Sequence, residues 1–399
     1  MEDSLRGYWR MNGGIDAHRS APRRTADSET RRRVLHLCMF DPHVPIAGGA
    51  PRGQNFSSRL AERFDVDLLY LDSVSVTRDL AARFAHAVKG VRSKTAVRFS
   101  QTGYFLFSPR LYRAAANLLR EHAYHAIVCD LGMSALYGWL LSRRFGVRFV
   151  YSSHNVEHQM YRDKAREDWR RWPLVPYVYL VERLGARSCD LLVAINQSDA
   201  EFFARWADPA KIMVIPQCVD TEVFNPFYSP SRNETKTILF SGDYKTVFNR
   251  EAVDIVVERI LPRVLADWPQ ARFVFVGSSP PTHIQHPQVE FTGFVDDYPA
   301  VLRVADVFIS PIRRGHGFPT KMVEALACGK PIVSTPIGAR GIGGGFSRLY
   351  IREIDEFPAM ILRLLREDRA VSADDFEEVQ ARYSWPRYVS ELADRIESL

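Results

Sequence analysis

Apolar and polar positions follow one another along the chain in a pattern that predicts a mixed helix-and-strand fold. Short apolar runs bounded by glycine or polar residues predict buried strands at 34–40, 66–71, 126–129, 148–152, 191–195 and 211–215. Stretches with helical apolar spacing predict helices at 54–63, 134–144, 158–187 and 199–206. The basic stretch 78–122 also reads as helical. Strands that alternate with helices predict a parallel sheet with right-handed crossovers.

The pattern is interrupted at 216–236, where proline, asparagine and serine accumulate as in a linker. It then begins again, with strands expected at 237–240, 272–276, 289–291 and 307–310, and helices at 249–265, 299–305 and 376–398. The predicted fold class is α/β, with two Rossmann-like domains facing a central cleft. Ligands of such sheets bind at the carboxyl ends of the strands.

These breaks give the expected domain boundaries. Residues 1–31 are polar and contain several arginines, without the apolar core of a signal peptide, so we expect a disordered tail or an overlong start. The first domain is expected at 32–215 and the second at 237–375, on either side of the linker 216–236. The terminal segment, 376–399, is expected to form a helix that packs back on the first domain.

Charge is spread unevenly over a composition that is otherwise ordinary for a globular protein. The chain of 399 residues has a net charge of +6, but residues 1–220 hold 32 Lys and Arg against 23 Asp and Glu, and 78–149 hold 12 against 3. Aromatic residues lie among the basic ones. This predicts peripheral contact between 78–149 and an anionic membrane or acceptor; an ordinary solvated basic face is the alternative. No zinc-finger or RNA-binding signature accompanies it, so nucleic acid is not an expected partner.

The cysteines and the lengths of the apolar runs indicate in which cellular compartment the protein works. The five cysteines are scattered, without a C-x-x-C pair, and mostly lie in or beside apolar runs, as small core residues do. This favours a reduced, cytoplasmic setting, with peripheral attachment at the inner membrane face as a further expectation. No apolar run approaches the roughly 18 residues of a membrane-spanning helix. The longest, 126–141, is interrupted by Asp130.

The richest chemistry lies in residues 310–335, which read SPIRRGHGFPTKMVEALACGKPIVST. The order predicted is buried strand, glycine-rich loop, helix start, stop at Gly329 and a second buried strand. Backbone N–H groups and the positive helix end would then face one spot, an arrangement that holds phosphate. Arg313, Arg314 and Lys321 add positive charge, and Glu324 shares the helix face of Lys321. A cation for phosphate and a carboxylate for a sugar diol suit a nucleotide diphosphate.

Residues 324–333, EALACGKPIV, resemble the donor-binding signature of retaining glycosyltransferases of the family-4 type, which have the GT-B fold. The family pattern has two glutamates eight residues apart. The second corresponds to Glu324, which by this resemblance grips the ribose, while His316 stands where the first, a donor-sugar contact, is usual. The alternative is that Glu324 does not bind ligand and is merely a carboxylate that interacts favourably with the positive end of a helix.

A second resemblance lies in residues 151–157, YSSHNVE, directly after a predicted strand. His154 is similar to the family histidine that lies against the donor sugar and phosphate. Residues 154–158 also fit the zinc-peptidase pattern H-x-x-E-H with His158. That pattern needs both histidines on one helix, and here a strand runs up to His154. A third ligand is not evident, so we expect no metal.

Further positions resemble donor-binding parts of the same family. Gly48 and Gly49 resemble its N-terminal glycine loop, Gly242 follows a strand as a phosphate-approach position, and residues 291–297 resemble the loop that contacts the base. The full set of expected donor-binding residues is Gly48, Gly49, Gly242, Lys245, Gly277, Phe294, Val295, Arg314, His316, Gly317 and Phe318.

Two further patterns in the sequence fit less well. A dinucleotide dehydrogenase would need G-x-G-x-x-G directly after the first strand, and the glycines begin eight residues beyond Phe40. The D-x-D at Asp65 and Asp67 lies at the start of a strand, which favours a structural role.

The sequence therefore predicts a retaining glycosyltransferase, without metal or cofactor, that uses a UDP- or GDP-sugar and a glycan, lipid-linked or other acceptor. Its expected nearest relatives are bacterial exopolysaccharide and exosortase-linked sugar transferases. Lys321, Arg314 and the Gly317 loop would stabilise the departing diphosphate, and His154 would orient the sugar. Two alternatives stay open. One is a sugar-nucleotide epimerase of the same fold, and the other is an inactive nucleotide-sugar-binding protein, suggested by His316.

Overall fold

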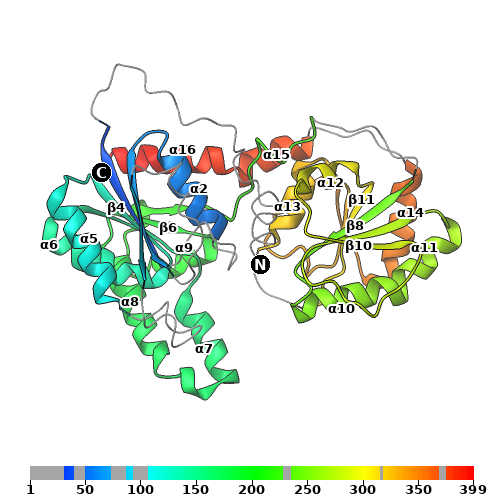
Figure 1. Cartoon of the computed structure of the whole chain (residues 1–399), viewed down its shortest axis with the longest axis horizontal. Coiled ribbons are helices and arrows are strands. Elements are labelled where there is room, and N and C mark those ends of the chain that lie inside the picture. Colours follow the sequence, from blue (N-terminus) through cyan, green and yellow to red (C-terminus); the bar gives the residue numbers. More distant parts are fainter. Residues whose placement is uncertain are drawn as a thin grey trace. The chain divides into compact units, whose positions relative to one another are not determined.

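The computed structural model describes residues 31–39, 50–72, 87–92, 107–227, 235–314, 318–367 and 374–399. The chain divides into two compact units (Figure 1). The first unit comprises Ala17–Pro216 with Pro386–Leu399, and the second contains Gln217–Trp385. Both are α/β, which confirms the predicted fold class.

The described part of the first unit contains a seven-stranded parallel sheet in the order β3-β2-β1-β4-β5-β6-β7. Its strands are β1 (Arg33–Cys38), β2 (Asp65–Asp72), β3 (Ala87–Arg92), β4 (Ala126–Asp130), β5 (Arg148–Ser152), β6 (Leu191–Ala194) and β7 (Ile212–Val214). The helices are α2 (Ala50–Leu60), α5 (Pro109–Glu121), η2 (Gly132–Ser134), α6 (Ala135–Phe145), α7 (Glu157–Glu167), η3 (Trp169–Arg171), α8 (Leu174–Ser188), α9 (Gln197–Phe203), η4 (Pro209–Lys211) and α16 (Trp385–Glu397). The strand order reverses between β1 and β4, so their carboxyl ends border the position where such sheets bind ligands.

The second unit has, among its described residues, a six-stranded parallel sheet in the order β10-β9-β8-β11-β12-β13. Its strands are β8 (Thr237–Ser241), β9 (Arg272–Val276), β10 (Val289–Gly293), β11 (Val307–Ser310), β12 (Ile332–Ser334) and β13 (Leu349–Ile351). The helices are α10 (Val247–Ile255), η5 (Val256–Ile260), α11 (Leu261–Asp267), α12 (Tyr298–Val304), α13 (Thr320–Ala327), η6 (Ile354–Glu356), α14 (Phe357–Glu367) and α15 (Asp374–Tyr383). Here the order reverses between β8 and β11.

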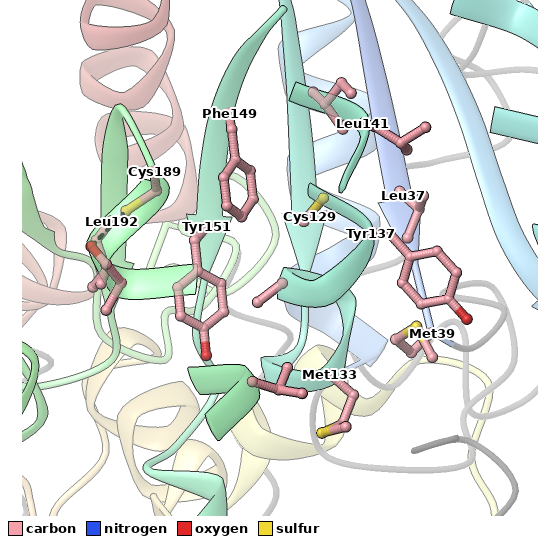
Figure 2. Packing of buried hydrophobic residues seen from close by; sticks show 14 of the residues in the cluster. Leu37, Met39, Cys129, Met133, Tyr137, Leu141, Phe149, Tyr151, Cys189 and Leu192 are labelled. Carbon is pink, nitrogen blue, oxygen red and sulfur yellow. Dashed lines mark hydrogen bonds between the residues drawn. The ribbon is translucent and has the colours of Figure 1, made fainter. Parts of the chain in front are cut away.

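Helices cover both faces of each sheet, so the central strands β4 and β11 are buried along their whole length, without alternation of buried and exposed positions. In the first unit, α5, α6, α8 and α9 pack on one face around the residues drawn in Figure 2, which include Leu37, Phe149 and Leu192. Each fully buried leucine or phenylalanine of this kind stabilises the fold by about 1.5–3 kcal/mol. Cys129 and Cys189 belong to this core, and all five cysteines are buried and outside disulfides, as predicted for core residues.

The prediction of helix throughout 78–122 is wrong for 87–92. These residues form β3, which pairs in parallel with β2 at the edge of the first sheet, and only Pro109–Glu121 of the described residues there are helical. Backbone pairing with β2 overrides the weak local preference of a stretch that contains Gly90, Lys89 and Arg92. Basic residues are common in edge strands, because they discourage pairing with another chain.

Three predicted helices are interrupted. The stretch 158–187 is divided into α7 and α8 by a turn in which the Asp168 side chain accepts a hydrogen bond from the Arg170 N–H and Pro173 follows. The stretch 249–265 contains η5, a wide π-type turn, directly before α11. Pro262 is the second residue of α11 and has no N–H to give to the preceding turn, which accounts for the irregularity.

The predicted helix 376–398 is divided at Ser384 into α15 and α16. Ser384 forms an isolated β-bridge with Val219, whose N–H donates to Tyr383 O at 2.8 Å. The two helices belong to different units: α15 packs in the second and α16 in the first. In the first unit, Arg63 forms ion pairs of 2.5 Å with both Asp394 and Glu397 of α16.

The α7–α8 hairpin extends away from the sheet of the first unit (Figure 1). At its turn the Trp169 side chain is 76% exposed and that of Trp172 is 46% exposed. Among the described residues, no helix combines the length and apolar character that crossing a bilayer requires.

Candidate functional site

Glycine residues lie at the carboxyl ends of three neighbouring strands in the second unit, where they leave the backbone without side chains. Gly242 follows β8, Gly277 follows β9 and Gly293 ends β10. The Gly242 N–H donates to Val276 O at 2.9 Å, and the Gly277 N–H donates to Gly293 O at 2.9 Å. Gly277 has φ +141°, and a Cβ there would lie 1.8 Å from the Gly242 carbonyl oxygen. Only glycine fits this arrangement.

Lys321 reaches the same place from the first turn of α13. Its Nζ donates a hydrogen bond to the carbonyl oxygen of Ser241, the residue before Gly242, and lies 4.7 Å from the centroid of the Phe240 ring. Burial lowers the pKa of Lys321 to about 8, and nearby Glu324 opposes this shift. The structure therefore brings Lys321 to the backbone beside Gly242.

Glu324 lies one turn further along α13 and is only 5% exposed. Burial raises the pKa of its carboxyl to about 8, with Lys321 acting in the opposite direction. No described residue donates a hydrogen bond to its carboxylate. A carboxylate this buried lowers the stability of the folded protein when it is ionised. A surface carboxylate near a helix start would not, so the burial of Glu324 does not fit that alternative. The stop of α13 is as predicted, since Gly329 has φ +67°.

The two arginines of the β11–α13 loop are exposed and held by one acid. Arg314 Nε lies 2.7 Å from Glu251 Oε2, and Arg313 Nη1 lies 3.9 Å from Glu251 Oε1. Glu251 belongs to α10, which follows the Gly242 loop. This ion pair fixes Arg314 near that loop while neutralising part of its charge.

The other predicted donor-binding residues are placed as follows. Lys245 is exposed, and its N–H donates to Asp243 Oδ1 at 3.1 Å. Phe294 and Val295 directly follow Gly293 and are half-buried, and the ring centroids of Phe318 and Tyr383 are 5.4 Å apart. Gly48, Gly49, His316 and Gly317 lie outside the described residues.

In the first unit, His154 pairs with an acid that the sequence-based site had missed. His154 Nε2 lies 2.8 Å from Asp130 Oδ1, and both residues are buried. Burial alone would raise the pKa of Asp130. The His154 ring, with His36 and Arg52, outweighs this effect and lowers the pKa to about 2. The available signal was Asp130 itself, a charged residue at the end of a buried strand.

Arg52 is the second residue that sequence reasoning missed. It lies in the first turn of α2 and is completely buried, and its Nη1 donates to Ile215 O at 2.8 Å. Its Nε lies 3.4 Å from Ser152 Oγ, at the carboxyl end of β5. A buried guanidinium needs nearby negative charge, which Asp130 supplies.

The H-x-x-E-H alternative does not match the geometry. His154 precedes α7, whereas His158 lies within it. The two rings are bound to different acids, because His158 Nδ1 lies 2.8 Å from Glu182 Oε2. Elsewhere among the described residues, His36, Cys38 and Asp130 could together offer three metal ligands. His36 Nδ1 is already 2.9 Å from Ser57 Oγ, and its Nε2 is 3.3 Å from Cys38 Sγ, so both ring nitrogens contact side chains of this chain.

Glu157 is a further buried acid at the start of α7. Burial, reinforced by Glu182, raises its pKa to about 8, and its Oε2 has no hydrogen-bond partner in the structure described. Glu182 accepts from the Glu157 N–H at 2.6 Å, so this acid pair also holds the first turn of α7.

Comparison with known proteins agrees with this geometry. Residues 48–223 match the model of Glycosyltransferase Family 4, and residues 235–367 match that of Glycosyl transferases group 1. Among curated proteins, D-inositol 3-phosphate glycosyltransferase of Stackebrandtia nassauensis is 29% identical over 65% of this chain and 65% of its own length. The protein of the same name from Mycobacterium marinum is 25% identical over 91% of this chain and 84% of its own length.

Solved structures share the architecture. HepE from Anabaena in complex with UDP has a TM-score of 0.67 at 16% identity, covering 92% of this chain and 100% of its own. Sucrose-phosphate synthase from Thermosynechococcus elongatus has a TM-score of 0.64 at 18% identity, over 92% of this chain and 99% of its own. Together, the two sequence models and these structural neighbours identify the chain as a glycosyltransferase enzyme of the family-4 type, with the GT-B fold.

Proposed function

We propose that the protein is a retaining, metal-independent transferase that moves a sugar from a nucleoside-diphosphate donor, a UDP- or GDP-sugar, to an anionic acceptor. The observation that carries the proposal is α13, which presents Lys321 and Glu324 one turn apart beside the bare backbone at Gly242 and Gly277. HepE binds UDP and UDP-glucose in its own structures, which supports a uridine nucleotide as the first donor to test.

Each residue has a distinct role in this proposal. Lys321 balances the charge that grows on the departing diphosphate, using Nζ donors beyond the one given to Ser241. Glu324 accepts hydrogen bonds from the ribose hydroxyls, and Phe294 and Val295 contact the base. His154 orients the donor sugar, and the leaving phosphate takes the acceptor proton.

The acceptor is proposed to carry phosphate, free or on a lipid. The curated relatives include D-inositol 3-phosphate glycosyltransferases and the gpi3 subunit of phosphatidylinositol N-acetylglucosaminyltransferase from Schizosaccharomyces pombe, which is 24% identical over 48% of this chain and 44% of its own length. An exopolysaccharide precursor, the acceptor class suggested by the expected nearest relatives, is the second candidate. The positive charge of 78–149 favours an anion in either case.

A membrane-borne acceptor would be met at the cytoplasmic face. The predicted contact region, 78–149, is described only in part, at 87–92 and 107–149. The α7–α8 turn adds exposed Trp169 and Trp172, with exposed Arg162, Arg166 and Arg170 nearby. Tryptophan with arginine is typical of surfaces that rest on anionic lipid.

A thermal-shift panel of UDP-, GDP- and ADP-sugars and the parent nucleotides, with and without EDTA, tests the donor. We expect one nucleotide family to raise Tm equally in both conditions, because a ligand that binds only the folded state stabilises it by RT ln(1 + [L]/Kd). No shift with any nucleotide would contradict the proposal. A shift that EDTA abolishes would contradict the metal-independent mechanism alone.

Measurements of donor turnover distinguish the proposed transferase from two other functions. A same-fold epimerase converts the donor without acceptor, and buried Glu157 and Glu182 are the carboxylates that would favour it. An inactive binding protein gives a thermal shift but neither transfer nor hydrolysis. Transfer of label from the donor to inositol 3-phosphate, phosphatidylinositol or a polyprenyl-diphosphate sugar is expected of the transferase only.

A further inference from the structure

Three donors converge on one backbone carbonyl in the loop between β8 and α10 of the second unit. The Asp243 carbonyl oxygen accepts from the Thr246 N–H at 3.2 Å, from Thr246 Oγ1 at 2.7 Å and from Asn249 Nδ2 at 2.8 Å. The Asp243 side chain is held as well, because its Oδ1 accepts from Ser278 Oγ at 2.6 Å. The turn that follows Gly242 is therefore held in one orientation from several sides.

Asn249 packs its side-chain amide directly on the Gly242 backbone. It lies in the first turn of α10 and is only 4% exposed. A Cβ on Gly242 would lie 2.7 Å from Asn249 Nδ2 and 2.8 Å from its Cγ. Because a carbonyl oxygen can only accept, the amide atom that faces the Asp243 carbonyl is the nitrogen. The amide oxygen, Oδ1, is buried and has no hydrogen-bond partner in the part of the chain that the structure describes.

The stability of the fold does not explain an asparagine at this position. A buried acceptor without a partner lowers the stability of the folded protein. An apolar side chain at position 249 would avoid that cost, and the Asp243 carbonyl would keep both donors of Thr246. A buried polar group that is retained at a cost to stability points to a role in function.

The same loop leaves backbone donors for a ligand. Thr246 is the N-cap of α10, but its side chain makes no capping hydrogen bond, since Oγ1 donates to the Asp243 carbonyl instead. The Asp243 N–H donates to none of the described residues. N–H groups at an uncapped helix start, beside glycine backbone, are suited to bind phosphate oxygens.

We propose that Asn249 is a positioning residue, whose amide holds the turn at Gly242 and Asp243 so that the Asp243 N–H and the first N–H groups of α10 bind the donor diphosphate. The proposal rests on the proposed function, because the ligand is the diphosphate of that donor. Asn249 acts through the turn and does not itself touch the diphosphate. All of these residues belong to the second unit.

Binding of a nucleoside diphosphate and of its nucleoside tests this role. The full chain is titrated with UDP and with uridine, or with GDP and guanosine if the donor panel selects guanine, and ligand-observed NMR covers the weaker affinity. In Asn249→Ala we expect the Kd of the diphosphate to rise on the order of 10-fold, because hydrogen bonds to a charged phosphate weaken when their donors are no longer held. The Kd of the nucleoside, which has no phosphate, should stay within about twofold. A loss that the nucleoside shares, or an unchanged Kd of the diphosphate, would overturn the inference.

Thermal unfolding gives a second readout. Asn249→Ala should change Tm by no more than about 2 °C, because it removes an unpartnered buried acceptor together with one hydrogen bond. Asn249→Leu keeps the branched shape of the side chain without its polar atoms, and it should give the same small change in Tm and the same weaker binding of the diphosphate. If Asn249→Leu binds the diphosphate normally, the amide is not what positions the turn, and the inference is wrong.

Asn225→Ala is the matched control in the same unit. Asn225 is 5% exposed, its Nδ2 donates to Glu222 O at 2.9 Å, and its Oδ1 accepts from the Phe227 N–H at 3.2 Å. Because both ends of this amide are partnered, the variant should lower Tm by more than Asn249→Ala does and leave the Kd of the diphosphate within about twofold. The reverse order of the two Tm changes would assign Asn249 a structural role and overturn the inference.

The unaltered protein shows which proposal is at fault when binding fails. If it binds no nucleotide, the proposed function fails and this inference with it. If it binds the diphosphate and both Asn249 variants bind it equally well, only the inference fails.

Discussion

At the residue scale, Lys321 and Glu324 differ from ordinary lysine and glutamate residues in the pH at which they ionise. Both are titratable groups of one helix face, and burial moves the two pKa values toward each other, to about 8. Around neutral pH a small change in surroundings, such as the arrival of a diphosphate, therefore changes their charge. Catalytic and binding groups are often tuned in this way.

Lys321→Ala should lower the transfer rate on the order of 100-fold or more, because removing a preorganised donor to a developing oxyanion costs about that much. In the unaltered enzyme, nucleotide affinity should fall as pH rises through about 8, where Lys321 loses its proton. Isothermal titration with the nucleotide found in the donor panel measures this. Lys211→Ala, an exposed lysine of the first unit, is the control. An unchanged rate in Lys321→Ala would remove Lys321 from the site.

Glu324→Gln should change how stability depends on pH. Burial raises the pKa of Glu324 from an ordinary 4.5 to about 8, so the folded state holds this proton more tightly than the unfolded state. The resulting stability is fully present below pH 4.5 and is lost as pH rises through about 8. The Tm of the unaltered protein minus that of Glu324→Gln should therefore decrease from pH 5 to pH 9.

Glu157 shifts in the same direction, so the unaltered protein carries both effects and each glutamine variant removes one. A constant Tm difference between the unaltered protein and Glu324→Gln would show that Glu324 is ionised throughout this range. That result would also contradict its buried environment.

At the scale of elements, the ends of β8, β9 and β10 depend on glycine. Gly277→Ala places a Cβ 1.8 Å from the Gly242 carbonyl at φ +141°. We expect a loss of about 1–3 kcal/mol in the free energy of unfolding, together with weaker nucleotide binding. Gly344→Ala is the matched control, because a Cβ there meets nothing within 4 Å. Urea unfolding compares the two, and equal stability would show that the three strand ends rearrange freely.

The α7–α8 turn carries its own prediction. Trp169→Ala with Trp172→Ala should weaken binding to phosphatidylglycerol vesicles at low salt and leave the donor-induced Tm shift unchanged, because these side chains are exposed. Flotation across a salt series measures the binding. Phe227→Ala is the control, since Phe227 is an aromatic residue of the second unit that is 70% exposed. Binding that persists in the tryptophan variant would assign lipid contact to another surface, and no binding at all would end the membrane proposal.

Prediction from the sequence succeeded where an element depends on a local pattern of residues. The strands Arg148–Ser152, Arg272–Val276 and Val307–Ser310 are confirmed to the residue, because each is an apolar run between clear boundaries. It failed at β3, whose strand conformation depends on pairing with β2. It also missed the partnership of Asp130 with His154, since no local pattern shows that residues 24 apart in the chain meet at neighbouring strand ends.

At the scale of the whole molecule, the chain returns to the first unit with α16. Val389, Leu392 and Ile396 of this helix are buried there, whereas its ion pairs with Arg63 are partly exposed. Leu392→Ala should therefore cost about 2–5 kcal/mol, and Arg63→Ala no more than about 1 kcal/mol. Hydrogen exchange should assign the loss in Leu392→Ala to the first unit. Equal costs for the two variants would contradict this division between apolar and ionic anchoring.

This return has a consequence for biosynthesis. Residues 217–385 of the second unit lie between the two parts of the first unit along the chain, so they emerge from the ribosome before the last helix of the first unit. The first unit therefore cannot complete its fold until residues 386–399 emerge. Until then, the surface that α16 covers in the finished protein stays exposed. Chaperones that hold exposed apolar surface would then act on the half that is synthesised first and completed last.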